Sequence, residues 1–505
     1  MVPIAPARDP LAWVRGGFLA LAGTATAMSV LVALNLTQDR WGLDRLREPA
    51  TIGWIAAILF VVVHRQPAER IAALVARGEC VLGHRRFFPV ASGTMLAFLL
   101  LVSLTRHWSF QTFSHDFSVF DLALAPTGGG WLDSPILGGS FLAEHFSPVL
   151  LALVPLRAVV ATPYLLVVLY PVVIWAAVFP LWRLLRGAGA TLGSANLICL
   201  LFLNAPILVT SVEYGFHVEG LLPLGVLTLF LAHRSGCRAV FWLLVVGCLS
   251  IKEDVAFYLV GFAAYLALGE RRWLRAAGVV FVSTAWLVLA VGVWMPAFGA
   301  PSDYRFLSRW DAWGDGLGGI VVGVGTQPLQ LAATLSDRAV VELFVGLLFL
   351  PLASRWAWTL VLSPLLLNTT SGLPLQAGLG GYYGLPALGF AAMAAVVGVE
   401  SPRFSTLAAR PWRVWLVIAA LVLSVSTACL VPHLGERPLQ VLRPLDEIVA
   451  DRVLLRFDDA TWPFEPVEAA ALAERLVASG EYLAEWVAPG FVFLARADTA
   501  TARED

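Results

Sequence analysis

Lysine is almost absent from the sequence, and charged residues of every kind are scarce. The 34 basic residues comprise 33 arginines and one lysine, Lys252, and charged residues make up 14% of the 505 residues. Soluble globular domains contain about 25% charged residues, so this composition excludes an ordinary soluble domain. The formal net charge is −1 and no basic cluster is present, which argues against a nucleic acid as a partner.

Paired cysteines and several common catalytic motifs are also missing. The five cysteines show no CxxC spacing, so the sequence indicates neither a disulfide framework nor a zinc site. There is no P-loop, no GxSxG motif and no HExxH motif. These absences argue against an ATP-driven engine and against a serine hydrolase of the nucleophile-elbow type.

Apolar segments dominate the sequence instead. Hydrophobic residues make up 59% of the chain and the mean hydropathy is +0.78, which is typical of a polytopic protein of the lipid bilayer. We predict an all-α bundle of about 13 transmembrane helices. The candidate spans are 13–35, 51–64, 88–105, 163–182, 192–210, 219–232, 239–251, 255–268, 276–296, 338–353, 356–368, 384–399 and 414–431. The first is longer than a typical signal-peptide core, so we interpret it as a retained signal anchor rather than a cleaved signal.

Arginine placement predicts the orientation of these spans. Arginines cluster in loops at 65–87, 183–186, 234–238, 271–275, 355 and 403–413, and we assign these loops to the cytoplasmic side. All of these loops can lie on the cytoplasmic side only if the segment 147–161, with Pro148, Pro155 and Arg157, does not cross the membrane. We therefore predict a re-entrant or interfacial helix there. The N-terminus is expected inside and the C-terminus outside.

The remaining loops fall on the extracytoplasmic side and contain nearly all of the unusual polar residues. They are 106–146, 211–218, 252–254, 297–337, 369–383 and the tail from 432. We predict a transmembrane domain over 1–431, with a functional loop at 106–161, and a small extracytoplasmic domain over 432–505. The tail carries 7 arginines and 14 acidic residues. Its pattern indicates a strand or helix at 446–456, a helix at 466–480 and a strand at 491–496, which together form a small α/β appendage.

The longest non-apolar stretch before residue 295 is 114–148. Asp116 and Asp121 lie five residues apart in HDFSVFDLAL, and Glu144 and His145 precede FSPVLLALVPL. The ordinary interpretation of the aspartates is helix capping in a solvated loop. The interleaved apolar residues indicate instead a segment that packs against the protein. A helix starting near 147 would place His145 at its N-terminus, where amide groups favour anions; an ordinary interfacial histidine is the alternative.

Two further motifs carry charge beside apolar spans. In EYGFHVEG, Glu213 and His217 would share a face if the segment is helical. A histidine together with carboxylates, such as His217 with Glu219, is a ligand set that suits Mn or Zn. IKEDV places Lys252, Glu253 and Asp254 inside an otherwise apolar sequence. Charges at membrane depth are costly and often mark function. The alternative is a tight turn with a local ion pair, although a compact ammonium is also a common phosphate binder.

Aromatic residues accompany two later loops. SDYRFLSRWDAWGDG, at 302–316, mixes tyrosine and tryptophan with charges, which suits sugar stacking and a membrane-interface belt equally. GLGGYYG, at 378–384, contains Tyr382 and Tyr383. These two tyrosines are candidates for a lid or an aromatic wall at an acceptor site, and the simpler interpretation is an interfacial anchor.

Five motifs in order, HDFSVFDLAL, AEHFSPVLLALVPL, EYGFHVE, IKEDV and GGYYG, resemble a family of polytopic bacterial membrane proteins that is classified as a domain of unknown function. The usual pattern of that family reads FDLGIFDQ, HFSP, FHpE, KED and an aromatic HY pair, and the resemblance covers about residues 100–400. This chain departs from it at Ser118 and Leu122, which replace Gly and Gln, and at Tyr382, which replaces His. Two extra spans precede the loop, where one span is usual.

That family looks like a distant branch of the GT-C membrane glycosyltransferases, which take sugars from polyprenyl-phosphate donors. The resemblance implies an inverting glycosyltransferase of the bacterial cytoplasmic membrane that serves the cell envelope. Asp116 would be the general base, with Asp121 as the second catalytic aspartate. His145, His217 and Lys252 would bind the donor phosphate. Glu219, Glu253 and Asp254 would hold a divalent cation, Mg²⁺ or Mn²⁺. The partners implied are the lipid-linked sugar and a glycan, lipid or protein acceptor.

Two other classes of function are compatible with the same residues. A transporter or flippase for a lipid-linked or polar solute would also keep charges such as Lys252 near the membrane. Transporters, however, need polar residues on both sides and often have inverted repeats, and neither is visible here. A scaffold that keeps the fold without chemistry is the third interpretation.

Overall fold

The computed structural model describes most of the chain between residues 80 and 402. The described ranges are 80–108, 112, 114–125, 131–134, 136–160, 163–301, 304–335, 340, 343–344, 346–402, 452–456, 474, 478, 482–488 and 491–496. The spans expected at 13–35, 51–64 and 414–431, and both chain ends, lie outside them. The described part is mostly helical, with two small sheets.

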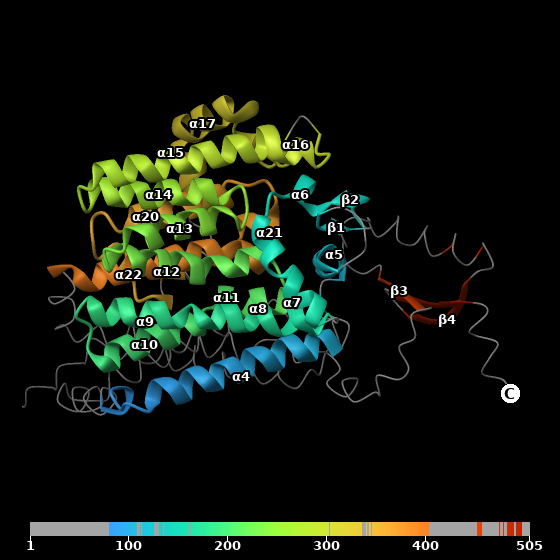
Figure 1. Ribbon diagram of the computed structural model, residues 1–505, viewed down its shortest axis with the longest axis horizontal. Helices are drawn as coiled ribbons and strands as arrows, with labels where there is room; N and C mark the ends of the chain where they lie inside the picture. The colour runs from blue at the N-terminus through green and yellow to red at the C-terminus, as the bar shows by residue number, and fades with distance from the viewer. Residues whose placement is uncertain are drawn as a thin grey trace, which may run out of the picture.

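The helices run side by side in stacked layers (Figure 1). The first half comprises α4 (Phe87–Trp108), α5 (Ser114–Leu124), β1 (Asp133–Ser134), β2 (Gly139–Ser140), α6 (Phe141–Glu144), α7 (Val154–Val159), α8 (Tyr164–Ala176), α9 (Val178–Gly187), α10 (Leu192–Leu203), α11 (Pro206–Tyr214) and α12 (Leu222–Arg234). The second half comprises α13 (Arg238–Leu249), α14 (Val255–Leu268), α15 (Trp273–Leu289), α16 (Met295–Ala297), α17 (Gly316–Thr326), α18 (Pro328–Leu335), α20 (Trp358–Thr369), α21 (Pro374–Ala377) and α22 (Gly384–Glu400). Short 3₁₀ helices occur at Pro148–Ala152, Val218–Leu221, Arg305–Trp313, Leu350–Leu352 and Gly381–Tyr383.

Five helical stretches among the described residues are long and apolar enough to cross a membrane. They are Phe87–Trp108, Tyr164–Gly187, Leu192–Tyr214, Trp273–Ala297 and Pro374–Glu400. Arg238–Leu249, Val255–Leu268 and Trp358–Thr369 are shorter apolar helices in the same stack. The protein is therefore a multi-pass helical membrane protein, as its composition predicts.

The connections between helices fall at two ends of the bundle. Figure 1 shows α5, α6, β1, β2 and α21 gathered at the end where α15 continues into α16. We call this the loop end; it also holds the turns at 215–221 and 250–254. The turns at 188–191, 235–237 and 269–272 lie at the opposite end. We call it the arginine end, because Arg186, Arg234, Arg238, Arg271 and Arg272 lie in or beside these turns. The arginine-bearing turns and the polar loops are thus separated along the helices in the way that the sequence predicts.

The segment 147–161 does not form a long helix. It contains the 3₁₀ helix Pro148–Ala152 and then α7, and together these reach only to Val159. Twelve residues of helix extend about 18 Å, which is less than the roughly 30 Å of a bilayer core. The segment is anchored at the loop end, because the Val149 amide donates a hydrogen bond of 3.0 Å to the Ser250 carbonyl.

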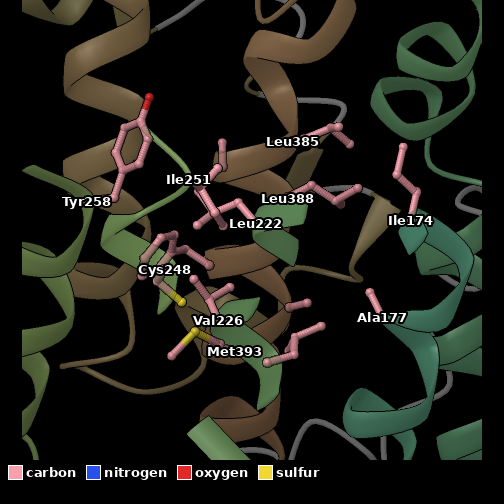
Figure 2. Close-up of a cluster of buried hydrophobic side chains, with 14 of the residues drawn as sticks. Ile174, Ala177, Leu222, Val226, Cys248, Ile251, Tyr258, Leu385, Leu388 and Met393 are labelled. Atoms are coloured by element: carbon pink, nitrogen blue, oxygen red, sulfur yellow. The ribbon is translucent and has the colours of Figure 1, made fainter. Parts of the chain in front are cut away.

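α22 is the central helix of the bundle, and 94% of its most apolar window is buried. Its sequence, GLPALGFAAMAAVVGVE, is rich in glycine and alanine, which allow neighbouring helices to approach closely. A side chain at Gly398 would collide with the Leu350 carbonyl. Figure 2 shows α22 residues such as Leu388 and Met393 in one cluster with Val226 of α12 and Cys248 of α13.

The helix α15 is at the edge of the bundle, in contrast to α22. Only 22% of its most apolar window is buried, and Leu274, Phe281 and Val288 are 93%, 73% and 62% exposed. In a membrane protein such a row of exposed apolar side chains faces lipid, because lipid tails solvate it without cost.

The C-terminal tail contains a three-stranded antiparallel sheet in the order β3-β5-β4. Its strands are β3 (Arg452–Arg456), β4 (Tyr482–Ala488) and β5 (Phe491–Arg496). β3 and β5 fall within segments where the sequence pattern allows strands, whereas β4 is a strand that the pattern did not indicate. Of the helix predicted at 466–480, the described residues Glu474 and Ala478 are helical.

Candidate functional site

Asp116 lies in the first turn of α5, where the helix dipole favours a carboxylate. Its Oδ2 atom is 3.3 Å from His217 Nε2 and 3.5 Å from the Tyr214 hydroxyl. The Asp116 side chain is 26% exposed, whereas that of His217 is 6% exposed. The structure thus brings together the first aspartate and the FHpE-type histidine, with the carboxylate on the accessible side of the pair.

His217 is held in place by the end of α11 and by aromatic rings. α11 ends at Tyr214, and Gly215 follows with a φ of +103°, a conformation that favours glycine. The His217 ring stacks on Tyr382 with centroids 3.6 Å apart. Because the backbone is extended at His217, the expectation that Glu213 and His217 share a helix face is wrong: Glu213 is a buried residue of α11 itself.

Asp121 has a different environment from Asp116. It accepts two hydrogen bonds from Arg157, 3.0 Å from Nε and 3.2 Å from Nη2. Both side chains are largely buried, with 15% and 9% exposed. This paired contact ties α5 to α7 and is the geometry in which arginine binds a carboxylate most strongly. Asp121 therefore has a structural partner.

The Lys252–Asp254 turn is buried at the loop end between α13 and α14. Lys252 Nζ lies 2.6 Å from Glu219 Oε1 and 3.7 Å from Asp254 Oδ2. Burial lowers the pKa of Lys252, but the three neighbouring carboxylates outweigh it and raise the pKa above its usual value. Burial opposes ionisation of Glu219 too, and Lys252 followed by His217 holds its pKa below the usual value. Lys252 is therefore protonated, and the carboxylates around it balance its positive charge.

Glu253 is fully buried and accepts hydrogen bonds from three sides. Its carboxylate lies 2.8 Å from His145 Nδ1, 2.9 Å from the Phe146 amide and 2.7 Å from the Tyr304 hydroxyl. Burial opposes ionisation, but His145, with Lys252 and Tyr304, lowers the pKa of Glu253 to about 2. Glu253 therefore joins the HFSP loop, the KED turn and the segment after α16.

These contacts connect most of the candidate residues into one polar network, which we call the loop-end network. It consists of three contact groups, which are Asp116 with His217, Lys252 with Glu219 and Asp254, and Glu253 with His145 and Tyr304. The groups follow one another along the chain, because His217 is two residues from Glu219 and Lys252 is adjacent to Glu253. Tyr382 joins it by stacking on His217, and its hydroxyl lies 2.9 Å from that of Tyr383. Asp121 contacts Arg157, which lies outside this network.

The proposed cation ligands face different partners. Glu219 pairs with Lys252, and Glu253 is surrounded by donors. Burial raises the pKa of Asp254 to about 7; the charge of Lys252 opposes this rise, and the charges of Glu253 and Glu219 add to it. Among the residues that the structure describes, no group of three or more His, Cys, Asp or Glu side chains is arranged to hold a metal ion. The divalent cation expected at Glu219, Glu253 and Asp254 stays a prediction.

A cavity of about 450 Å³ opens beside the network. One side is the hairpin and helix from 136 to 144, and the other is the end of α15 with the turn that follows it. Tyr304, which contacts Glu253, lines the cavity together with Glu144 and Arg305. Asp116 and Lys252 are not among its lining residues.

Some functional contacts had weak signals in the sequence. Arg157 is a lone charge in an apolar run, which is a pattern that marks buried partners. Tyr304 and Arg305 lie in a segment recognised as aromatic and charged, but nothing in that segment indicates which residue meets Glu253 or Glu144. Tyr214 stands in the EYGFHVEG motif without a distinguishing feature.

The fold and the network define a class: a multi-pass helical membrane protein with a buried network of charged residues at the loop end of the bundle. The model of the DUF2079 family of predicted membrane proteins matches residues 106–440, and the chain belongs to this family. No curated protein and no solved structure matches the chain.

The low pKa of Glu253 predicts a specific acid sensitivity. A carboxylate whose pKa falls from about 4.3 in the unfolded chain to about 2 in the folded one stabilises the fold above pH 4. That contribution is lost as the pH falls from about 4 to about 2. We expect Glu253→Gln to have a lower midpoint of thermal unfolding than the wild type at pH 6, and the gap to narrow below pH 4. A gap of constant size across this range would contradict the assignment.

Proposed function

We propose that the protein is a GT-C type glycosyltransferase that transfers a sugar from a polyprenyl-phosphate donor to an extracytoplasmic acceptor. In this proposal the bundle has about 13 helices, and the loop end faces the extracytoplasmic side. The observation that carries the proposal is the Asp116–His217 pair, in which an accessible carboxylate is held beside a buried charged network.

Asp116 would act as the general base. Its carboxylate would take the proton from an acceptor hydroxyl while the hydroxyl oxygen attacks the anomeric carbon from the face opposite the phosphate. The bond from the anomeric carbon to the phosphate oxygen breaks, and the configuration inverts. A base of this kind contributes typically 10²–10⁴-fold when it is correctly positioned. His217 supports this role because its Nε2 contacts Asp116 while its ring is fixed against Tyr382.

Lys252 and His145 were expected to bind the donor phosphate, but in this proposal they have a supporting role instead. Lys252 is paired with Glu219, and His145 is paired with Glu253. A phosphate would have to displace these buried carboxylates, and breaking such pairs is costly. Lys252 and His145 therefore position the loops around the site. Tyr382 is half-buried and its ring would be the one to stack against a sugar, whereas Tyr383 is buried behind it.

Solute transport is the second candidate, because the Lys252–Glu219–Asp254 cluster buries charge between helices. This cluster lies at the loop end, and a second charged group, made of His233, Arg234, Arg275 and Glu270, lies at the arginine end. Apolar residues such as Val226 and Met393 pack between the two ends (Figure 2). A transferase needs one such site, whereas a transport pathway needs polar groups along its length.

The discriminating experiment uses the purified protein in proteoliposomes. A polyprenyl-phosphate donor carrying a radiolabelled sugar is added with an extract of membrane glycans, lipids and proteins as acceptors. The transferase proposal predicts that label moves from the lipid into the acceptor fraction. Release or uptake of intact labelled donor without movement of label to any acceptor would reject it in favour of transport.

A further inference from the structure

The cavity at the loop end has one apolar wall and one charged rim. Val291, Met295 and Phe298 form the wall. Val291 lies in the turn after α15, Met295 begins α16 and Phe298 follows α16. The chain then folds back at Gly299, whose φ is +102°. The volume of the cavity, about 450 Å³, is within the range of small-molecule sites in proteins.

The wall belongs to the lipid-facing edge of the bundle. The span Trp273–Ala297 is the most exposed of the five described, and Val288 and Val293 remain 62% and 52% exposed near the cavity. Because these residues are at the end of a span, the cavity lies at the level of the lipid headgroups. Trp286 and Trp294 stand at the same level, as tryptophans commonly do at this interface.

A π-helical turn shapes this wall. Residues Ala290–Trp294 leave the α-helical register within an otherwise continuous span, a feature that is frequent at functional sites. The turn places Val291 toward the cavity, while the Trp294 ring stacks on Phe146 with centroids 4.7 Å apart. Phe146 follows His145, so the wall is packed directly on the loop-end network.

The rim of the cavity is suited to an anion. Arg305 forms an ion pair with Glu144, and both line the cavity. The Arg305 side chain is 46% exposed. Arg305 and Arg309 lie over the same Phe306 ring, each 4.7 Å from its centroid. Burial and then the charge of Arg309 lower the pKa of Arg305, so an anion placed here would relieve the repulsion between the two guanidinium groups.

We infer that this cavity binds the phosphate and the first apolar units of a phosphate-bearing lipid, and that the phosphate replaces the Glu144 carboxylate on Arg305. A guanidinium binds phosphate and carboxylate with the same two-pronged geometry, so the exchange conserves the contact. The apolar wall continues onto the lipid-facing side of α15, which lets the lipid tail remain in the bilayer. The identity of the lipid as a polyprenyl phosphate rests on the proposed function.

Occupancy of the cavity is linked to the loop-end network through Tyr304. This side chain lines the cavity and donates its hydroxyl hydrogen to Glu253. Its neighbour Phe306 also lines the cavity and stacks on the His145 ring with centroids 4.4 Å apart. A bound phosphate would therefore lie beside the two residues that fix His145 and Glu253.

The test is photolabelling of the full-length protein in detergent micelles. The probe is a polyisoprenyl monophosphate with a diazirine near the phosphate, and the same chain ending in a hydroxyl is the control probe. We expect phosphate-dependent labelling of peptides from 136–144 and 291–306. Arg305→Gln should reduce it by about tenfold or more, since a charge-assisted contact is lost. Glu144→Gln should raise it about two- to fivefold, because the competing carboxylate is removed.

Arg238→Gln is the matched control, because Arg238 is an exposed arginine at the opposite end of the bundle; its labelling should equal that of the wild type. Equal labelling by the alcohol probe, or unchanged labelling of Arg305→Gln, would overturn the inference. Competition by inorganic phosphate alone at equal concentration would assign the site to a soluble anion and would also overturn it. Asp116→Asn should keep full labelling, so that loss of sugar transfer and loss of lipid binding are separate outcomes.

Discussion

Replacing Lys252 with methionine is expected to destabilise the protein by about 3–5 kcal/mol, the cost of removing one partner from a buried ion pair. Lys252 and Glu219 are each 5% exposed, and the distance between Nζ and Oε1 is 2.6 Å. Methionine fills most of the volume of the lysine stem, so the loss arises mainly from leaving Glu219 charged and unpaired. The free energy of unfolding, from denaturant titration of the purified protein, measures this effect.

The double variant Lys252→Met with Glu219→Leu separates the pair from its surroundings. Because both charges are removed, we expect it to recover most of the stability that the single variant loses. Arg238→Met is the control for removing an exposed cation and should change the free energy of unfolding by less than about 0.5 kcal/mol. A cost below about 1 kcal/mol for Lys252→Met alone would mean that the ion pair is not the contact that holds this turn.

The positions of the network residues could be predicted from the sequence, whereas their pairings could not. Lys252 and Glu253 stand out because charges are expensive in an apolar sequence. Their partners are 33 and 108 residues away, at Glu219 and His145. Such pairings depend on how the helices stack, and no local pattern contains that information. The sequence therefore predicts that these residues gather at one end but not which carboxylate neutralises which cation.

Local backbone conformation explains the expectation that failed. Glu213 and His217 have helical spacing, but Gly215 adopts a positive φ and directs the chain out of α11. A glycine near the end of a helix is a signal for termination, and it outweighs the spacing here. The consequence is functional, because only the extended conformation places His217 against Asp116 and Tyr382.

The cavity lies beyond what the sequence could predict. Its two sides come from segments about 150 residues apart, 136–144 and 291–306. The apolar wall depends on a π-helical turn inside a span that reads as a regular apolar helix. Recognition of Arg305 as an aromatic-flanked charge was possible, but its pairing with Glu144 depends on the docking of one loop against the other.

Asp116→Asn is expected to reduce sugar transfer by about 10²–10⁴-fold, because the amide cannot accept the proton of the attacking hydroxyl. The effect on stability should be small. The side chain is 26% exposed, and the amide oxygen can still accept a hydrogen bond from His217. Initial rates of transfer from a labelled polyprenyl-phosphate sugar in proteoliposomes, normalised to folded protein, measure the effect.

The two aspartates of the same helix make this prediction specific. Asp121→Asn weakens the paired contact to Arg157 and should lower stability, while the transfer rate per folded molecule stays within about threefold of the wild type. Asp133→Asn, in β1 of the same loop, should leave the transfer rate per folded molecule unchanged. If Asp116→Asn retained full activity, or if Asp121→Asn lost activity without losing stability, the roles of the two residues would be the reverse of those proposed. The present assignment rests on their contacts: Asp116 contacts a histidine beside an accessible surface, and Asp121 contacts a buried arginine. Either of these outcomes would require the catalytic role and the supporting role to be reassigned.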